Sequence, residues 1–307
     1  MKCSSRARHR LLPNRDAPRR PLQFLVACAP LRARHNARMS IQLGANGRRS
    51  VQVEVEVPGT PEQVWAAVAT GAGISAWFVP ASVEERAGGI IALDFGGGMV
   101  TSSAITAWCP PHSFVAEDSS WLQGGPSVAT EWSVTAQANG LCSVRVVHTL
   151  VADSDAWDAH LEGTEHGWPG YFRVLRQYLT HHAGQPSASF VLMATASDDA
   201  RAVWKTLAGA LGVPQARVGQ AVHIAAEGAA PITGTVEALD DVPQGQGAMI
   251  AVRAPAPGVV LASGMDCMGM RMATLQAFYY GPQASAAAQD RGHWERWLLA
   301  LFPPPQG

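Results

Sequence analysis

The sequence predicts an α+β protein in which an antiparallel sheet packs on a long C-terminal helix, with this unit repeated in tandem. Three observations predict this fold class. Apolar and polar residues alternate along several short segments between residues 51 and 150, which is the pattern of half-buried strands. An apolar stripe with helical spacing follows at 168–179. The same order of elements then returns after residue 190, which indicates a duplication.

The first predicted elements are a strand and a short helix. Val51–Val57 alternates valine with polar residues over seven positions. Thr60 then suits an N-cap, Pro61 suits the first helical position, and Gln63 completes the spacing of a capping box. Gly71 ends this helix. A second short helical turn before Pro80 is predicted by three apolar residues, Ile74, Trp77 and Phe78.

About six antiparallel strands and their covering helix are predicted next. Asn139–Gly140 lies between two alternating runs and is a strong hairpin signal. Strand parity places one set of side chains on the inner face, namely Val128, Thr130, Trp132, Val134, Cys142, Val144, Val146, His148 and Leu150. The helix that covers this face carries an apolar stripe of Trp168, Phe172, Leu175 and Leu179. Pro169 is expected in the first turn of that helix.

The chain divides into four expected segments. Residues 1–48 form a disordered basic arm, with Met39 as an alternative start of the protein. Residues 49–183 form the first domain, 184–189 a polar linker, and 190–304 a second, diverged copy. In this copy Val203–Trp204 repeats Val64–Trp65, and a closing helix carries Trp294, Trp297, Leu298 and Leu301.

Charge and cysteine content exclude several classes of function. Residues 1–38 hold ten of the 23 basic side chains and one of the 24 acidic ones, so this segment carries +9 and residues 39–307 carry −10. A folded part this acidic does not suit nucleic-acid binding, and no apolar run is long enough for a membrane helix. Two alternatives remain for the arm, nucleic-acid binding and an export signal that ends near Cys28. The five cysteines show no pairing pattern, so reduced thiols in a cytoplasmic protein are expected.

The motifs resemble one known superfamily. A strand, a P-x-x-V-W helix, a G-x-x-x-x-W-F segment, a meander of strands and a long glycine-tryptophan helix are similar to the START-like, helix-grip superfamily (SRPBCC), in the branch homologous to the activator of the heat-shock chaperone ATPase. The residues that carry this resemblance are Pro61, Val64, Trp65, Gly73, Trp77, Phe78, Ile105, Pro110, Pro111, His148, Gly167, Trp168, Tyr171, Phe172, Leu175 and Tyr178. The resemblance implies a curved sheet that grips the long helix around an apolar cavity. It covers residues 50–182 well and 190–302 less well.

Candidate site residues follow from that cavity. Its wall is expected to include Trp77, Phe78, Trp132, His148, Trp168 and Tyr171, because the sheet face and the long helix line it. His148 is the candidate for an acid or base, although a structural histidine suits an inward strand position better. Trp65 recurs as Trp204 and is expected to be core packing. No metal site or cofactor is predicted: Asp94 and Glu131 are expected to face solvent, and the methionine-rich segment 265–272 suits core filling better than Cu(I).

Three functions remain open at this point. The first is binding of an apolar small molecule or a partner protein without established catalysis. The second is a polyketide cyclase-like enzyme with an acid or base in the cavity, and the third is a co-chaperone-like regulator of a chaperone ATPase. A convergent polar pair inside the cavity favours the enzyme, whereas an exposed apolar patch favours the regulator. Motifs of P-loop ATPases, serine hydrolases and zinc peptidases do not occur in the sequence.

Overall fold

The structure is a computed structural model that describes residues 41–96, 98–119, 125–152, 155–242, 245–267 and 270–303. Its first half contains β1 (Gln42–Leu43), β2 (Arg48–Pro58), α1 (Pro61–Ala69), α2 (Gly71–Ser75), β3 (Ala81–Val83), β4 (Ile90–Asp94), β5 (Val100–Cys109), β6 (Ser113–Asp118), β7 (Val128–Ala136), β8 (Leu141–Val151) and α3 (Asp158–Gln177). Its second half contains β9 (Ser187–Ala196), α4 (Ala200–Ala210), β10 (Ala221–Ile224), β11 (Ile232–Val242), β12 (Gly245–Ala254), β13 (Gly258–Cys267), β14 (Met270–Tyr280), α5 (Ala284–Ala288) and α6 (Arg291–Leu301). Within the described part of the chain, no helix is both long enough and apolar enough to cross a membrane.

The two sheets have the same strand order, which confirms the tandem duplication. The first sheet runs β1-β2-β8-β7-β6-β5-β4-β3, and the second, taken from its other edge, runs β9-β14-β13-β12-β11-β10. When β9 is matched with β2, the strands β14, β13, β12, β11 and β10 correspond to β8, β7, β6, β5 and β4, and the edge strands β1 and β3 of the first sheet have no counterpart in the described residues. Val64 and Trp65 also occupy the same positions in α1 as Val203 and Trp204 occupy in α4. The chain therefore has the α+β helix-grip fold twice in tandem.

Local sequence signals explain how the first half is built. The Thr60 hydroxyl accepts a hydrogen bond from the Gln63 backbone N–H at 3.3 Å, and the Gln63 side chain accepts one from the Thr60 N–H at 3.0 Å, which completes the predicted capping box. Asn139 and Gly140 have positive φ angles of 61° and 70°, so they close the predicted hairpin between β7 and β8. A side chain at Gly73 would lie 1.9 Å from the Ala66 carbonyl oxygen, so glycine lets α2 pack against α1.

The long helix differs from its prediction at the N-terminal end. It begins at Asp158, so Pro169 lies inside the helix and not in its first turn. Proline removes one helical hydrogen bond, but Trp168 just before it and Phe172 three residues after it are buried in the core and hold the helix in place. At its start, Asp158 pairs with the Arg49 guanidinium of β2 at 2.5 Å. The predicted stripe is confirmed because all four of its residues are buried.

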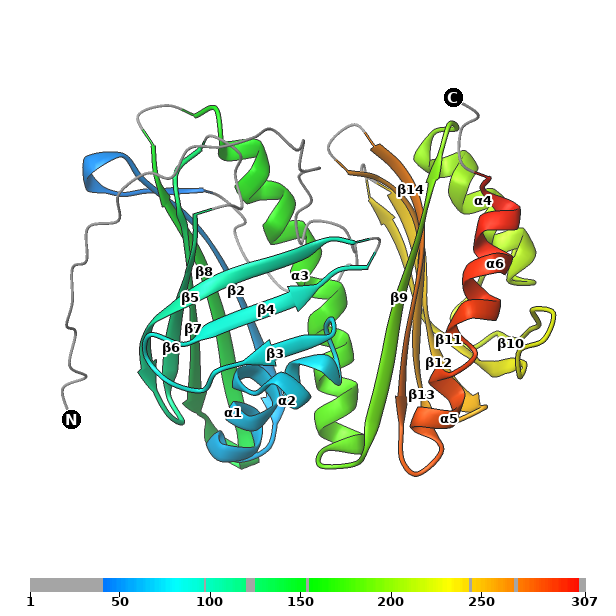
Figure 1. The fold of residues 1–307 in the computed structure, drawn as a ribbon, viewed down its shortest axis with the longest axis horizontal. Helices are drawn as coiled ribbons and strands as arrows, with labels where there is room; N and C mark the ends of the chain where they lie inside the picture. The colour runs from blue at the N-terminus through cyan, green and yellow to red at the C-terminus, as the bar shows by residue number, and fades with distance from the viewer. Residues whose placement is uncertain are drawn as a thin grey trace.

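Helix α3 is covered on both sides. In Figure 1 it lies between the sheet of the first half and strands β9 and β14 of the second, while α4 and α6 lie on the outer face of the second sheet. One core joins α3 to the first sheet and also includes Met249, Val259, Phe278 and Tyr280 from the second sheet. A second core lies between the second sheet and its own helices. A helix with two buried faces is expected to be apolar on both, and Val174, outside the predicted stripe, is fully buried.

Polar contacts also cross between the halves. The Tyr280 hydroxyl donates to the Ala76 carbonyl at 2.9 Å, the Ser189 hydroxyl donates to the Ser75 carbonyl at 2.9 Å, and the Gln276 amide donates to the Phe78 carbonyl. The Arg173 guanidinium of α3 lies 3.8 Å from the carboxyl group of Asp240 on β11, whose side chain is 5% exposed. The second sheet therefore holds both α3 and the segment that follows α2.

Several sequence expectations need correction or fall outside the described residues. Residues 42–48, expected within the basic arm, instead form β1, a turn and the start of β2, because β1 pairs with β2. Strand β9 begins at Ser187, inside the expected linker. Cys109 is disulfide-bonded, so the expectation of reduced thiols is wrong for this residue, whereas Cys142 is a buried free thiol. Residues 1–40 lie outside the described part of the chain, so the two functions expected of the arm, nucleic-acid binding and export, stay predictions.

Candidate functional site

A cavity lies between the first sheet and α3. It offers about 80 Å³ of space to the centres of water-sized molecules, which is more than one water molecule requires. Its lining comes entirely from the first half and consists of Val68, Ile74, Trp77, Phe78, Ile91, Leu93, Thr101, Ser103, Phe114, Ala116, Asp118, Thr130, Trp132, His148 and Trp168. The structure therefore places Trp77, Phe78, Trp132, His148 and Trp168 of the expected site on one cavity wall.

Aromatic rings form the apolar part of this wall. The ring of Trp132 on β7 meets that of Trp168 on α3 edge to face, at a centroid distance of 5.2 Å and an angle of 86°. Trp77 lies 6.1 Å from Trp132 in a similar arrangement, and Phe78 lies 5.2 Å from Trp168. Phe114 stacks on the other side of Trp132 at 6.1 Å. Such contacts between large rings make a wall of fixed shape.

The Trp77 ring is fixed by a hydrogen bond as well as by packing. Its indole N–H donates to the Ala67 carbonyl of α1 at 2.9 Å, and the residue is 1% exposed. The segment that bears Trp77 and Phe78 follows α2 and is held from behind by the three contacts from the second sheet described above. Both halves of the chain therefore position this part of the wall.

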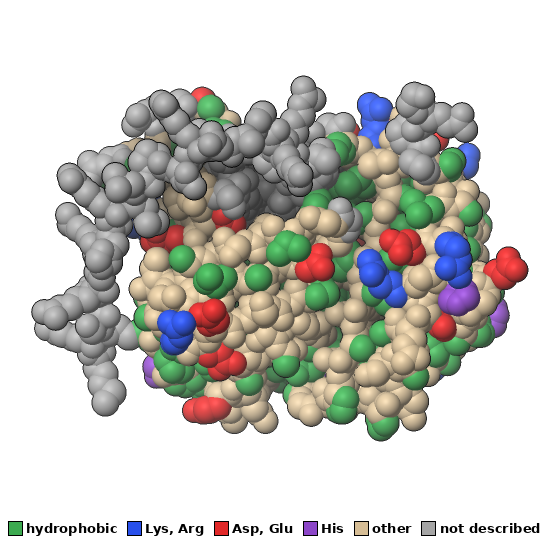
Figure 2. All heavy atoms as spheres, in the orientation of Figure 1, with side chains coloured by type: hydrophobic (Ala, Val, Ile, Leu, Met, Phe, Trp, Pro, Cys, Tyr) green, Lys and Arg blue, Asp and Glu red, His purple; other side chains and the backbone are tan. Residues whose placement is uncertain are grey.

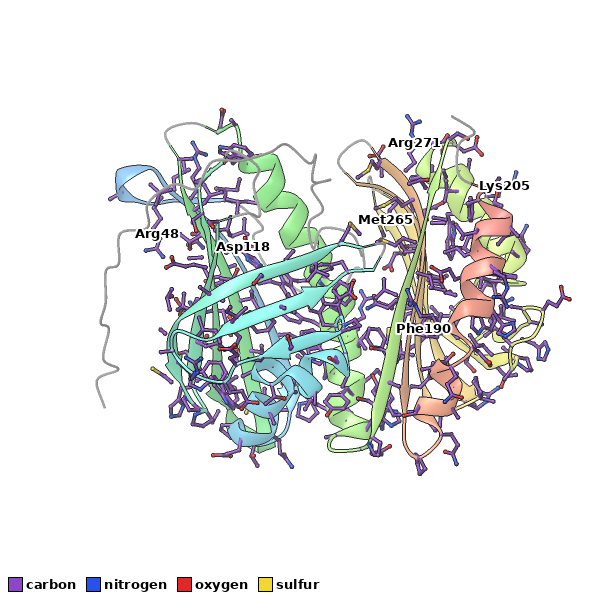
Figure 3. All side chains as sticks on the ribbon, viewed as in Figure 1. Arg48, Asp118, Phe190, Lys205, Met265 and Arg271 are labelled. Atoms are coloured by element: carbon purple, nitrogen blue, oxygen red, sulfur yellow. The ribbon has the colours of Figure 1, made fainter. Side chains whose placement is uncertain are left out.

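Oxygen-bearing side chains line the other end of the cavity. Thr101 and Ser103 come from β5, Asp118 from β6 and Thr130 from β7. Thr130 lies directly between Ala116 and His148 in the strand register. Asp118 is 4% exposed, on the same face of β6 as Phe114 and Ala116. Figure 3 shows where Asp118 lies among the strands of the first half.

His148 has a defined tautomer in this arrangement. The Trp168 indole N–H donates to His148 Nε2 at 2.8 Å, so Nε2 must be unprotonated. The proton of the neutral ring is then on Nδ1, which lies 2.9 Å from the Thr130 hydroxyl and donates to it. Burial lowers the pKa of His148 to about 3. The histidine is therefore a neutral group that joins β7, β8 and α3.

Two other aromatic residues named in the sequence analysis, Tyr171 and Trp65, do not line the cavity. Tyr171 is half-buried and packs edge to face on Phe78 at 4.6 Å, so it supports the wall from outside the cavity lining. Trp65 packs against Trp108 at 5.0 Å and Phe114 at 5.9 Å, which agrees with its interpretation as core packing.

Sequence reasoning missed the buried carboxylate. Asp94 is exposed, and Glu131 is half-exposed and pairs with Arg145, so both lie outside the cavity as expected. Asp118 was detectable, because Phe114, Ala116 and Asp118 are alternate residues of one strand and must share a face. The two hydroxyl residues of β5, Thr101 and Ser103, share a face with the buried Ile105, so the same parity argument would have found them.

The other candidate groups stay outside any site. Met265 and Met272 are buried and pack with Met193 and Met270 in the second half, whereas Met268 lies outside the described residues. His160 and His166, with Glu162 and Glu165, lack the sequence spacing of a metal site, and their side chains lie outside the described part of the structure. In the part that the structure describes, no group of three His, Cys, Asp or Glu side chains could hold a metal ion.

Comparison with known proteins gives one family match. The model of the family described as activator of Hsp90 ATPase homolog 1-like protein matches residues 58–180, the segment that contains every cavity residue. No curated protein matches the chain.

Several solved structures are similar to parts of the chain. CalU16 from Micromonospora echinospora is 19% identical, with a TM-score of 0.37, over 47% of this chain and 84% of that one. The Aha1 dimer from Colwellia psychrerythraea is 16% identical, with a TM-score of 0.36, over 42% and 95%. The di-domain ARO/CYC BexL of the BE-7585A biosynthetic pathway is 14% identical, with a TM-score of 0.40, over 82% and 94%.

Proposed function

We propose that the protein binds an apolar small molecule between its first sheet and α3, the part of the chain that matches the model of the family described as activator of Hsp90 ATPase homolog 1-like protein. The cavity of about 80 Å³ supports this proposal. Protein interiors are otherwise close-packed, and pockets for small molecules are mostly apolar with a few polar groups. The proposed site residues are Trp77, Phe78, Trp132, His148 and Trp168, with Tyr171 behind them.

A protein partner is less well supported by the surface. The large apolar side chains that are exposed in the described part come from seven separate segments: Leu43, Ile90, Val100, Val151, Val218, Leu239 and Leu299. Figure 2 shows one face of the molecule, on which hydrophobic side chains are dispersed among polar ones. Scattered apolar residues are ordinary on protein surfaces, whereas a docking surface gathers them. This arrangement favours the small-molecule function over the co-chaperone-like one.

The geometry also argues against His148 as the acid or base of a cyclase-like enzyme. Both of its ring nitrogens are engaged, one with Trp168 and one with Thr130, and its pKa is lowered by burial. A general base near neutral pH needs a free nitrogen and a pKa close to the working pH. The proposal is therefore binding without catalysis. If the cavity does catalyse proton transfer, Asp118 is the residue to test as the acid or base.

The second half is proposed to be structural. Its sheet supports α3 and holds the carbonyls of Ser75, Ala76 and Phe78, which flank Trp77 on the cavity wall. Its own helices and sheet share a separate core. This role fits a diverged copy that has kept the fold. A cytoplasmic location stays a prediction from the sequence.

The proposal is tested by a thermal-shift screen of apolar and aromatic compounds. A ligand that binds only the folded state stabilises it by about 2.7 kcal/mol at 100 times its Kd, so the unfolding temperature rises with ligand concentration. Ala116→Leu places a larger apolar side chain in the cavity and is expected to abolish the shift. Ala129→Leu, on the opposite face of the same sheet, is the matched control and should keep it. The proposal fails if no compound gives a shift, or if Ala116→Leu responds as the wild type does.

A further inference from the structure

The cavity has an aromatic end and an oxygen-rich end, and β6 connects them. Phe114, Ala116 and Asp118 are alternate residues of this strand and all line the cavity. Alternate residues of a strand are about 7 Å apart, so about 13 Å separate Phe114 from Asp118. Ala116 lies between them with the smallest side chain of the three. A molecule of one or two rings placed over Ala116 can reach both ends.

Cross-strand register gathers the oxygen atoms at the Asp118 end. Ala104 pairs with Glu117, and continuing this register by one residue puts Ser103 opposite Asp118. On the other side of β6, Thr130 pairs with Ala116, and Thr101 of β5 also lines this end. Two neighbouring strands therefore supply a carboxylate and two hydroxyl groups to this end of the cavity, while the Thr130 hydroxyl lies level with Ala116 and contacts His148.

The charges at this end select the kind of polar group that can enter. No lysine or arginine occurs among the described residues that line the cavity, and His148 is neutral with both nitrogens engaged. A carboxylate only accepts hydrogen bonds, and its two oxygens offer about four acceptor positions, so Asp118 can accept from a ligand in addition to its protein partners. A second anion buried beside it would be repelled at low dielectric.

We propose that the ligand is an aromatic molecule with one hydrogen-bond-donating group, a hydroxyl or an amine, whose ring packs against the wall formed by Trp77, Trp132 and Trp168 and whose donor points to Asp118 and Ser103. This inference rests on the proposed small-molecule function and specifies its ligand class. It excludes aromatic carboxylates and phosphates. The aromatic rings supply affinity for the body of the ligand, and the oxygen-rich end discriminates between head groups.

Three probes that differ in a single substituent test the head group. Toluene has no polar group, p-cresol adds a hydroxyl donor, and p-toluate adds an anionic carboxylate at pH 7. Isothermal titration calorimetry on the full chain is expected to give p-cresol a Kd at least about tenfold lower than that of toluene, because hydrogen bonds to charged groups are strong. p-Toluate is expected to bind more weakly than toluene.

Two substitutions assign this selectivity to the residues. Asp118→Asn keeps the shape but removes the charge, so the preference for p-cresol over toluene should shrink to a few-fold and p-toluate should gain affinity. Ser103→Ala should weaken the binding of p-cresol and leave the affinity for toluene unchanged. This variant also tests the proposal if Asp118→Asn does not fold. Glu117→Gln removes the neighbouring carboxylate, which is exposed on the other face of β6, and should change none of the three affinities.

The outcomes separate this inference from the proposed function. Equal affinity for toluene and p-cresol, or tightest binding of p-toluate, overturns the ligand class while small-molecule binding stands. The same p-cresol preference in wild type, Asp118→Asn and Ser103→Ala overturns the placement of the head group. Binding of none of the three probes, together with no shift from any compound in the thermal screen, overturns the proposed function itself.

Discussion

His148 shows how two neighbours fix the chemistry of one residue. The Trp168 N–H requires an unprotonated Nε2, and the Thr130 hydroxyl accepts from Nδ1, so a single neutral tautomer satisfies both contacts. Protonation of the ring would place a second donor against the indole N–H in a buried site. The residue therefore stabilises the junction of β7, β8 and α3 only while it is neutral.

This neutral state predicts a pH dependence of stability. In the unfolded chain histidine takes up a proton below about pH 6.5, but the folded protein resists until pH falls to about 3. Stability is then fully present above pH 6.5 and falls as the pH decreases to about 3, by up to about 1.4 kcal/mol per pH unit. The variant His148→Gln keeps a donor and an acceptor. Its free energy of unfolding, measured by chemical denaturation between pH 4 and 7, should depend less steeply on pH, because one proton fewer is taken up on unfolding.

The control for this prediction is His112, an exposed histidine on the loop between β5 and β6. His112→Gln should leave the pH slope of the unfolding free energy as in the wild type. An unchanged slope in His148→Gln would contradict the neutral, buried state of His148.

At the scale of elements, the segment after α2 depends on contacts from the second half. Its carbonyls at Ser75, Ala76 and Phe78 accept hydrogen bonds from β9 and β14. These carbonyls would otherwise be buried without a partner, which costs free energy. The same segment carries Trp77, so its position determines the shape of the cavity wall.

Loss of one such contact is expected to affect both stability and binding. Tyr280→Phe removes the donor to the Ala76 carbonyl, which should lower the free energy of unfolding by about 1 to 3 kcal/mol. It should also weaken ligand binding, because Trp77 is less well held. Denaturant unfolding and calorimetry measure the two effects.

Tyr279 is a matched control on the opposite face of β14. Its hydroxyl is buried, and no hydrogen-bond partner for it is found in the described part of the chain. Tyr279→Phe should therefore leave stability unchanged or slightly increased, with no effect on ligand affinity. Equal losses of stability in both variants would show that the contact with the Ala76 carbonyl has no special role.

At the scale of the whole molecule, the two halves share a buried ionisable pair. Burial raises the pKa of Asp240 to about 8, although Arg173 at 3.8 Å opposes this shift. The carboxyl group ionises near pH 4 when the chain is unfolded, whereas in the folded protein it keeps its proton up to about pH 8. The contribution of Asp240 to the free energy of unfolding is therefore highest below about pH 4 and falls as the pH rises to about 8.

Asp240→Asn should remove this dependence on pH. Between pH 5 and 8 the variant should lose less stability than the wild type, by up to about 1.4 kcal/mol for each pH unit, as measured by denaturant unfolding. Asp241→Asn is the control, since this neighbouring carboxylate is exposed and pairs with Arg201. A parallel pH profile in Asp240→Asn and the wild type would contradict a protonated Asp240 at the interface.

The elements of the molecule were largely predictable, because periodicity and turn chemistry are local. The capping box at Thr60, the hairpin at Asn139–Gly140 and the helical stripe from Trp168 each occur as the sequence predicts. The place of Pro169 inside α3 was not predicted, because proline is an ordinary signal for a first turn and only burial of the surrounding helix overrides it.

The arrangement between the elements was less predictable. Strand parity identified His148 as inward, but its tautomer depends on Trp168, twenty residues away on another element. Nothing in the periodicity indicated that the second sheet covers α3, because this contact joins two units whose own patterns are complete. Asp118 could have been found by extending the parity argument to β6, whereas its proximity to Ser103 needed the register between strands.

The most direct test of ligand binding in the first half is a crystal structure of the full chain grown with p-cresol. We expect electron density for one ring in the cavity, packed against Trp77, Trp132 and Trp168, with the hydroxyl within hydrogen-bond distance of Asp118. Density for the compound only at other places, or an interior filled by protein side chains where the cavity should lie, would contradict this prediction.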